Sequence, residues 1–392
     1  MRIRIVTYST KARGGVVHAL CLAEALGDRG HDVELWALSA DGARFFREPR
    51  VPARLVPVDR RPGEEVEPRI LRYAAVLAEG LRRAGPADVH HSEDCLSARA
   101  LLALRAEGAV PHVVRTIHHV DDFRSPVLIE CQRASIEDVD HRICVSRHWA
   151  DRVRAENGVE AEVIPNGIDG ARFAGAALDR VAAGELLGWG ARPAVLAVGG
   201  IEPRKGSRTL LAAFAAARER LGRGALLAIA GGETLFDYAD YRAAWEEDAR
   251  RLGLAVSRGA EVPPTADVAV LGPVPDPRMP ALYRAADVVA FPSEREGFGL
   301  VVLEAQASGR PVVASDLPVL REFLADGRDC LMVPVGDAAA LAGALARAMG
   351  DAALRSRLVD GGRATAARFT WAAAAEAHER FYERTGVLDL AR

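Results

Sequence analysis

The chain has 392 residues, which is enough for two domains of ordinary size, and its 49% hydrophobic and 27% charged residues exclude a wholly disordered protein. Its net charge of −3 excludes bulk binding of nucleic acid through charge. No apolar run approaches the roughly 18–20 residues that a transmembrane helix needs. These properties indicate a globular protein of the size of an enzyme.

Strand and helix patterns alternate from the N-terminus. Ile3–Tyr8 is an apolar run of strand length, Val16–Leu26 repeats apolar residues at helical spacing after Gly14-Gly15, and Asp32–Leu38 predicts a second strand. Such a strand–helix–strand unit favours a parallel sheet covered by helices. Further strands are predicted at Val56–Val58, Val89–His91, Val113–Ile117, Arg142–Val145 and Val163–Pro165, with helices at Pro68–Ala84 and Ser97–Glu107.

The alternation weakens at Pro165–Asp169, whose Pro-Asn-Gly sequence is turn chemistry, and it resumes at Ala194–Val198. Two α/β series separated by this joint predict two Rossmann-like domains, residues 1–168 and 169–369, with a cleft between them. Ligands of open α/β sheets bind beyond the carboxyl ends of the strands, so we expect functional residues there. The second series has predicted strands at Ala225–Ala230, Val268–Leu271, Val288–Phe291 and Pro311–Ala314 and helices at Ser207–Leu221 and Leu300–Ser308.

Residues 233–267 are less regular and indicate an elaborated loop and helix. They carry four aromatic side chains, which would form either a wall against a substrate or a satellite core. Aromatic groups of this kind more often cover a core, and we favour that interpretation. The four residues are Phe236, Tyr238, Tyr241 and Trp245.

The segment Phe291–Pro318 is the most informative part of the sequence. It predicts the end of a buried strand, a polar loop with glycines, a helix and another strand. Gly297 and Gly299 lie where the helix begins, where free N–H groups favour an anion. A carboxylate such as Glu304 accepts hydrogen bonds from a vicinal diol such as ribose, although acidic residues near helix starts are also common as surface residues.

This segment resembles the E-x7-E motif of glycosyltransferase family 4, here spanning Glu296 to Glu304 and followed by Gly309-Arg310-Pro311. The resemblance implies retaining enzymes with the GT-B fold, in which the final helix, here within 370–392, crosses back to the N-terminal domain. Other segments that resemble the family are Gly14-Gly15, Thr116-Ile117-His118, Pro165–Asp169, Gly199–Gly206 and Phe369-Thr370-Trp371 with Tyr382.

By this resemblance, the C-terminal domain would bind a nucleotide-sugar donor, and the N-terminal domain the acceptor. Arg204 and Lys205, which lie between Gly200 and Gly206, would contact the donor diphosphate. The chemistry agrees, because a guanidinium and an ammonium stabilise a departing diphosphate without a metal ion. A solvated basic pair in a loop is the alternative for these two residues.

The resemblance assigns further roles to residues around the donor. Glu304 would bind the ribose hydroxyls, and Glu296 would orient the transferred sugar rather than attack it. His118 would hydrogen-bond a sugar hydroxyl and belong, with Glu296, Arg204 and Lys205, to the catalytic residues. Backbone close to the phosphates, sugar or base is implied at Gly15, Gly200, Gly272, Val274, Gly297, Phe298, Gly299 and Leu300.

Histidines and aspartates at strand ends offer a competing metal site. His90-His91 and His118-His119 each end a predicted strand, and Asp121-Asp122 follows the second pair. No H-x-x-x-H spacing is present, so we expect no metal. We interpret His90 and His119 as packed or surface residues, and His91, Glu93 and Asp121-Asp122 as residues that could touch the acceptor.

The expected activity is therefore retaining, metal-independent sugar transfer from a nucleoside-diphosphate sugar, most often a UDP-sugar in the family, to a small-molecule, glycan or lipid acceptor. A nucleotide-sugar 2-epimerase or a phosphorylase on the same fold and a non-catalytic nucleotide-sugar binding protein are alternatives. A dinucleotide-dependent oxidoreductase needs G-x-G-x-x-G after a strand, and neither Gly14-Gly15 nor Gly199-Gly200 fits.

The sequence also bears on location. The N-terminus lacks the order of a signal peptide, and the five cysteines form no C-x-x-C, so we expect a cytoplasmic protein with reduced thiols. The basic stretches Arg60–Arg72 and Arg142–Arg154 offer peripheral contact with anionic lipid, but both contain acids, which favours solvated faces.

Overall fold

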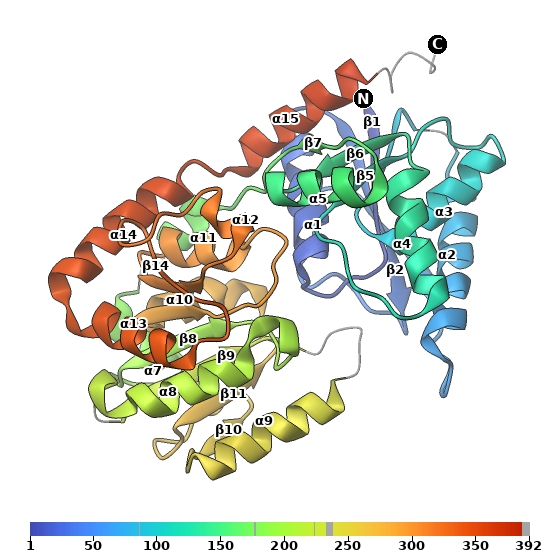
Figure 1. The fold of residues 1–392 in the computed structure, drawn as a ribbon. Helices are drawn as coiled ribbons and strands as arrows, with labels where there is room; N and C mark the ends of the chain where they lie inside the picture. The colour runs from blue at the N-terminus through green and yellow to red at the C-terminus, as the bar shows by residue number, and fades with distance from the viewer. Residues whose placement is uncertain (86, 176–177, 223, 233–237, 386–392) are drawn as a thin grey trace. The chain divides into compact units, whose positions relative to one another are not determined.

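A computed structural model shows two compact α/β units. Unit 1 comprises Met1–Gly167 with Thr370–Arg392, and unit 2 comprises Ile168–Phe369 (Figure 1). The structure describes residues 1–85, 87–175, 178–222, 224–232 and 238–385. The predicted fold class, two Rossmann-like domains with parallel sheets, is confirmed.

The sheet of unit 1 has seven parallel strands in its described residues, in the order β3-β2-β1-β4-β5-β6-β7. Their side chains are mostly apolar because helices cover both faces of the sheet. The strands are β1 Arg2–Thr7, β2 Asp32–Ala40, β3 Ala53–Val58, β4 Val89–Ser92, β5 Val114–Ile117, β6 His141–Cys144 and β7 Glu162–Val163.

Alternation along the strands of unit 1 divides its core into two layers. Ile3 and Ile5 of β1 pack in a cluster with the helices α1 and α15, whereas Val6 packs in a cluster with α2, α3 and α4. The helices of unit 1 are α1 Gly14–Asp28, α2 Val66–Arg83, α3 Cys95–Ala106, α4 Pro126–Glu137, α5 Arg147–Asn157 and α15 Trp371–Arg384.

Unit 2 repeats this architecture with seven parallel strands in its described residues, in the order β10-β11-β9-β8-β12-β13-β14. The strands are β8 Ala194–Val198, β9 Leu226–Ala230, β10 Val256–Arg258, β11 Val268–Gly272, β12 Val288–Phe291, β13 Val312–Ser315 and β14 Leu331–Val333. The helices are α6 Gly170–Ala174, α7 Arg180–Leu186, η1 Pro203–Lys205, α8 Ser207–Leu221, α9 Ala239–Arg251, η2 Asp276–Arg278, α10 Met279–Ala285, α11 Leu300–Ala307, α12 Pro318–Arg321, α13 Ala338–Gly350 and α14 Ala352–Ala366.

Each sheet has one point where the strand order reverses. In unit 1 this point lies between β1 and β4, and in unit 2 it lies between β8 and β12. The connections that leave the two neighbouring strands run in opposite directions there, which opens a crevice at the carboxyl ends of the strands. The segments that follow β1, β4, β8 and β12 are therefore the places to look for a site.

The chain crosses from unit 1 to unit 2 at Gly167, within the turn predicted from Pro165–Asp169. A Cβ atom at Gly167 would lie 2.3 Å from the backbone nitrogen of Trp371, so this close approach of two chain segments admits only glycine. Ile168 N–H donates to the carbonyl of Phe369 at 3.1 Å beside it. The outgoing and returning segments of the chain are thus in contact.

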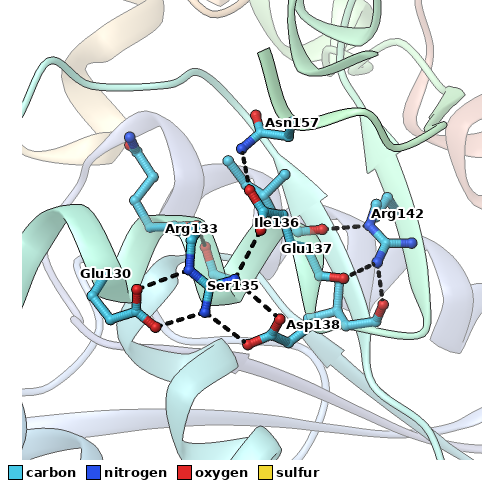
Figure 2. Close-up of polar contacts among 10 residues, drawn as sticks. Glu130, Arg133, Ser135, Ile136, Glu137, Asp138, Arg142 and Asn157 are labelled. Atoms are coloured by element: carbon cyan, nitrogen blue, oxygen red, sulfur yellow. Dashed lines mark hydrogen bonds and ion pairs between the residues drawn. The ribbon is translucent and has the colours of Figure 1, made fainter. Parts of the chain in front are cut away.

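The basic stretch Arg142–Arg154 begins with a residue that supports the fold. Arg142 donates to backbone carbonyls at the end of α4, including that of Ile136, and Figure 2 shows these contacts. In the same view, Arg133 of α4 pairs with Glu130 at 2.6 Å and with Glu137 at 2.8 Å. The interpretation of this stretch as a solvated face remains a prediction, but the Arg142 guanidinium is engaged by carbonyl groups of this chain.

Candidate active site

The predicted diphosphate loop of unit 2 lies at its switch point. β8 ends at Val198 and leads through Gly199 and Gly200 into η1, which carries Arg204 and Lys205. β12 ends at Phe291, and Glu296 follows in the loop before α11. Because β8 and β12 are neighbours, the two loops leave the same edge of the sheet side by side.

A cluster of charged side chains joins these two loops. Glu296 Oε1 accepts hydrogen bonds from Lys205 Nζ, from Arg204 Nη1 at 3.3 Å and from Ser293 Oγ at 3.0 Å. Burial alone would raise the pKa of Glu296, but the charges of Lys205 and Arg204 outweigh burial and lower it to about 2. Glu296 is therefore ionised at neutral pH and offsets the charge of the two cations.

Glycines allow the two loops to approach each other closely. Gly206 has φ +60°, and a Cβ atom there would lie 2.0 Å from the carbonyl oxygen of Pro292. A Cβ at Gly200 would lie 2.7 Å from the carbonyl oxygen of Gly232. A small pocket is lined by Gly199, Gly200, Lys205, Phe291 and Ser293 among others, so the lysine and the glycine backbone share one concave surface.

The start of α11 presents backbone groups, as the sequence predicted. Gly299 has φ +107° and precedes Leu300, and no side chain caps this helix start. Gly297 is buried, and the Phe298 side chain packs against Phe323 with ring centroids 5.3 Å apart. Phe298 therefore offers a ligand its backbone, because its ring belongs to the core.

Glu304 lies one turn into α11 and is partly buried. The Tyr283 hydroxyl of α10 donates to Glu304 Oε2 at 2.6 Å, whereas Oε1 makes no hydrogen bond with any described residue and is not sealed from solvent. Burial raises the pKa of Glu304 to about 7. One oxygen is thus held in place while the other is available to a ligand hydroxyl.

The segment predicted beside the base follows β11. Gly272 ends this strand with φ +68°, and Val274 lies two residues later and is partly buried. Gly272 O accepts a hydrogen bond from Gly231 N at 2.9 Å, which ties it to the glycines after β9.

The switch point of unit 1 holds a second polar cluster. Glu93 follows β4 and is buried, and its Oε2 lies 2.8 Å from His18 Nδ1 and 2.9 Å from His118 Nε2. A Cβ at Gly15 would lie 3.3 Å from His118 Cδ2, so this glycine lets the first turn of α1 pack on the ring. Burial lowers the pKa of His118 to about 4, so its imidazole is neutral.

His18, Glu93 and His118 are also the group in the described part of the chain that could hold a metal ion, with ligand atoms within 4.8 Å of one another. Two hydrogen bonds to Glu93 account for the observed distances without a metal. The expected absence of a metal remains a prediction. The set also differs from the competing site, because it excludes His90 and His119.

The other histidines and acids of that competing site lie elsewhere. His91 hydrogen-bonds the Tyr382 hydroxyl at 2.6 Å and the Thr116 hydroxyl at 2.7 Å, so both ring nitrogens are occupied by the core. His90 is buried, and burial lowers its pKa to about 4. His119 lies 3.3 Å from Asp121, and Asp122 lies 3.6 Å from Arg152, which places these acids in ion pairs near the strand end.

Among the aromatic residues of 233–267, Trp245 is fully buried in the core of unit 2 and donates to Ser207 O at 3.2 Å. The core interpretation is therefore confirmed for Trp245. Tyr241 accepts from Ser207 Oγ and from Arg208 N at 3.3 Å each, which fixes α9 to the start of α8. Tyr238 begins α9, and Phe236 lies outside the described residues.

Three contacting side chains were missed from the sequence. Ser293 lies within the quoted segment, three residues before Glu296, and its polarity at a strand end was a usable signal. His18 lies one turn into the helix after the first strand, which is also a usable signal. Tyr283 is 21 residues before Glu304 and gives no signal, because only the tertiary fold brings the two side chains together.

Comparison with known proteins agrees across the chain. Residues 12–172 match the profile described as Glycosyltransferase Family 4, and residues 192–351 match that described as Glycosyl transferases group 1. The D-inositol 3-phosphate glycosyltransferase of Salinispora arenicola is 32% identical and is aligned over 92% of this chain and 84% of its own. The phosphatidyl-myo-inositol mannosyltransferase of Mycobacterium tuberculosis is 33% identical over 98% of this chain and 97% of its own.

Solved structures show the same fold. Sucrose-phosphate synthase from Thermosynechococcus elongatus superposes with a TM-score of 0.80 at 23% identity, covering 98% of each chain. Anabaena HepE in complex with UDP-glucose superposes with a TM-score of 0.77 at 18% identity, covering 98% of this chain and 100% of HepE. Within the described residues, no helix is both long and apolar enough to cross a membrane.

Proposed function

Because this chain belongs to glycosyltransferase family 4, we propose that it transfers a sugar from a nucleoside-diphosphate sugar to an acceptor hydroxyl, with retention of configuration and without a metal ion. That it is a glycosyltransferase with the GT-B fold follows from its relatives and structural neighbours. The observation that supports the finer proposal most directly is the convergence of Arg204, Lys205 and Glu296 at the switch point of unit 2.

The diphosphate has a matching site there. A leaving nucleoside diphosphate gains negative charge as the sugar–oxygen bond breaks, so fixed cations stabilise the transition state more than the ground state. Arg204 and Lys205 supply these cations, and the backbone of Gly199 and Gly200 lines the same pocket. In the free protein Glu296 offsets the cations, and on donor binding the phosphate oxygens would share them.

The carboxylates of Glu304 and Glu296 have different proposed roles. Glu304 presents its free oxygen for a ribose hydroxyl, while Tyr283 holds the other oxygen. Glu296 has its pKa near 2 and is locked by three donors, so it suits a group that orients sugar hydroxyls better than a nucleophile. Retention then proceeds on one face of the sugar, with the leaving phosphate taking the proton of the acceptor.

The acceptor and the base are proposed from the relatives. Two relatives are named for D-inositol 3-phosphate and for phosphatidyl-myo-inositol, and HepE was solved with UDP-glucose. We propose a UDP-sugar as the donor to test before GDP- and ADP-sugars, and inositol-containing acceptors before other polyols. Family membership removes the oxidoreductase alternative. A 2-epimerase would instead change the configuration at C2 of the donor sugar, and it would do so without any acceptor.

Product analysis tests this proposal. The protein is incubated in EDTA with UDP-, GDP- or ADP-α-glucose or α-mannose and with D-inositol 3-phosphate or phosphatidylinositol vesicles. We expect acceptor-dependent release of one nucleoside diphosphate and an α-linked product by proton NMR. A β-linked product would refute retention, loss of activity in EDTA would refute metal independence, and an epimerised sugar without acceptor would establish the epimerase.

A further inference from the structure

Glu93, which the sequence suggested could touch the acceptor, is instead the centre of a buried network. Its side chain is fully buried, yet it is a charged group on a strand end that faces His18 and His118. Both histidine contacts fall on the same oxygen, Oε2, while Oε1 has no hydrogen-bond partner among the described residues. A buried carboxylate without partners would destabilise the folded protein, so the presence of Glu93 at this position needs a physical explanation.

The protonation of this network follows from its chemistry. Burial alone would raise the pKa of Glu93, but the charge of His18 and the hydrogen bonds from His118 and His18 hold it well below its usual range, so the group is an acceptor only. Each histidine must therefore present a hydrogen at the nitrogen that faces Glu93. Because the His118 ring is neutral, its proton lies on Nε2 and its Nδ1 carries a lone pair.

The outer nitrogen of His118 is the one that a ligand meets. Nδ1 makes no hydrogen bond with any described residue and is not sealed from solvent, and the side chain is 14% exposed. The close contact of the ring with Gly15 limits its rotation. His118 thus presents a hydrogen-bond acceptor, which suits a hydroxyl group and does not suit a phosphate or a carbonyl oxygen.

We propose that Glu93, supported by His18, is a positioning residue that fixes His118 as a hydrogen-bond acceptor for a sugar hydroxyl. This inference rests on the proposed function for the identity of the ligand, but not for the protonation of the ring. The logic is that of any buried acid that orients a functional imidazole: it selects one tautomer and one ring orientation. Without this acid the site would still fold, but the His118 proton could lie on either ring nitrogen.

The tautomer is measured directly on the substrate-free protein. Protein labelled with ¹⁵N-histidine is examined by long-range ¹H–¹⁵N correlation NMR, with His118→Asn used to assign the His118 signals. We expect Nε2–H and an unprotonated Nδ1 in the wild type. Glu93→Leu should lose this single tautomer, whereas Glu93→Gln should keep it, because the amide oxygen can replace Oε2 as the acceptor of both hydrogen bonds.

Turnover is measured on the same variants with the donor and acceptor found active. Glu93→Leu should lower kcat on the order of 100-fold with the nucleoside diphosphate Kd unchanged, and Glu93→Gln should restore most of it. Tyr382→Phe is the matched control: it removes a hydrogen bond to His91 in the same buried region but none of the hydrogen bonds to Glu93. Its tautomer and kcat should stay near the wild-type values.

Five results would overturn the proposal. Four of them are an Nδ1–H tautomer in the wild type, an unchanged tautomer in Glu93→Leu, equal damage by Glu93→Gln and Glu93→Leu, and equal damage by Tyr382→Phe. A fifth is capture of one equivalent of Zn²⁺ at the His18 and His118 nitrogens that face Glu93, which would make the cluster a metal site. If the wild type transfers no sugar, the proposed function fails while the NMR result still decides the role of Glu93.

Discussion

Two glutamates eight residues apart have opposite electrostatic environments. Glu296 lies between two cations and a hydroxyl, which hold its pKa at about 2. Among the described residues Glu304 has only the Tyr283 hydroxyl as a hydrogen-bond partner, and burial raises its pKa to about 7. The pKa values of these identical side chains thus move in opposite directions, because two cations contact Glu296 whereas burial dominates at Glu304. The difference separates their proposed roles and makes one of them sensitive to pH.

Nucleoside diphosphate affinity should depend on pH through Glu304. Only the ionised carboxylate accepts hydrogen bonds from both ribose hydroxyls, and a pKa near 7 leaves about a tenth of the sites ionised at pH 6 and about nine tenths at pH 8. Calorimetric Kd values should therefore be about tenfold weaker at pH 6. Glu304→Gln should bind more weakly by about 1.5–3 kcal/mol and lose this pH dependence.

The control in that experiment is the nucleotide itself, whose phosphate also titrates near pH 6. This contribution persists in Glu304→Gln, so the difference between the two proteins isolates the carboxylate. If wild type and Glu304→Gln show the same affinity and the same pH profile, Glu304 does not bind the ribose.

The Arg204→Ala/Lys205→Ala variant should lose turnover more than nucleotide binding. The charge that these residues meet grows in the transition state, so kcat should fall by about 10²–10³ while the nucleoside diphosphate Kd rises much less. Arg208→Ala is the matched control, since Arg208 is an exposed cation on α8 that pairs with Asp248. Equal losses in kcat and in binding would indicate ground-state binding only.

At the scale of elements, the glycine at the end of η1 sets how closely two strand-end loops approach. Gly206 has a left-handed φ, and a Cβ atom there would clash with the carbonyl of Pro292, which follows β12. Gly253 has a similar φ of +66° after α9, but a Cβ there would meet nothing within 4 Å. Comparing alanine variants at Gly206 and Gly253 therefore separates the energetic cost of backbone strain from the cost of the clash.

Gly206→Ala should destabilise unit 2 by about 3 kcal/mol or more, because the strain of a left-handed alanine adds to the displacement of the Pro292 loop. Gly253→Ala should cost only about 1–2 kcal/mol, the strain alone. Urea denaturation monitored by circular dichroism and tryptophan fluorescence gives both values. Similar costs for the two variants would show that the loops can separate freely.

Strand periodicity predicted most elements because buried parallel strands are continuous apolar runs. Ala194–Val198 and Val288–Phe291 have the predicted bounds, and helix α8 begins and ends as expected. Two edge strands were missed: β10 has only three residues, which are largely exposed, and β14 is a short run after a loop. Edge strands carry a weak pattern, because one side of the strand has no partner.

At the scale of the whole molecule, each unit places its polar cluster at its own switch point. Unit 2 has Arg204, Lys205 and Glu296 there, and unit 1 has Glu93 and His118. The residue types in the first cluster could be predicted from the sequence, since a glycine-flanked basic pair and an acid both follow strands. The contact of Glu93 with His18 could not, because it depends on strand order, which the sequence does not state.

The units should respond differently to a nucleotide. Because the proposed diphosphate and ribose groups all lie in unit 2, hydrogen exchange with a bound nucleoside diphosphate should slow in 199–206, 270–276 and 291–304. Peptides from the cores of both units that are remote from these loops serve as the internal control. Protection in unit 1 segments alone, such as 89–95, would place the nucleotide site in the other unit.

The most direct test of the central claim is a thermal-shift panel with UDP, GDP, ADP and NAD, each with and without EDTA. A ligand that binds only the folded state raises the Tm according to its concentration and Kd. We predict that one nucleoside diphosphate raises the Tm equally in EDTA and that Glu304→Ala reduces the shift. A shift with NAD alone, no shift with any diphosphate, or a shift abolished by EDTA would contradict the account.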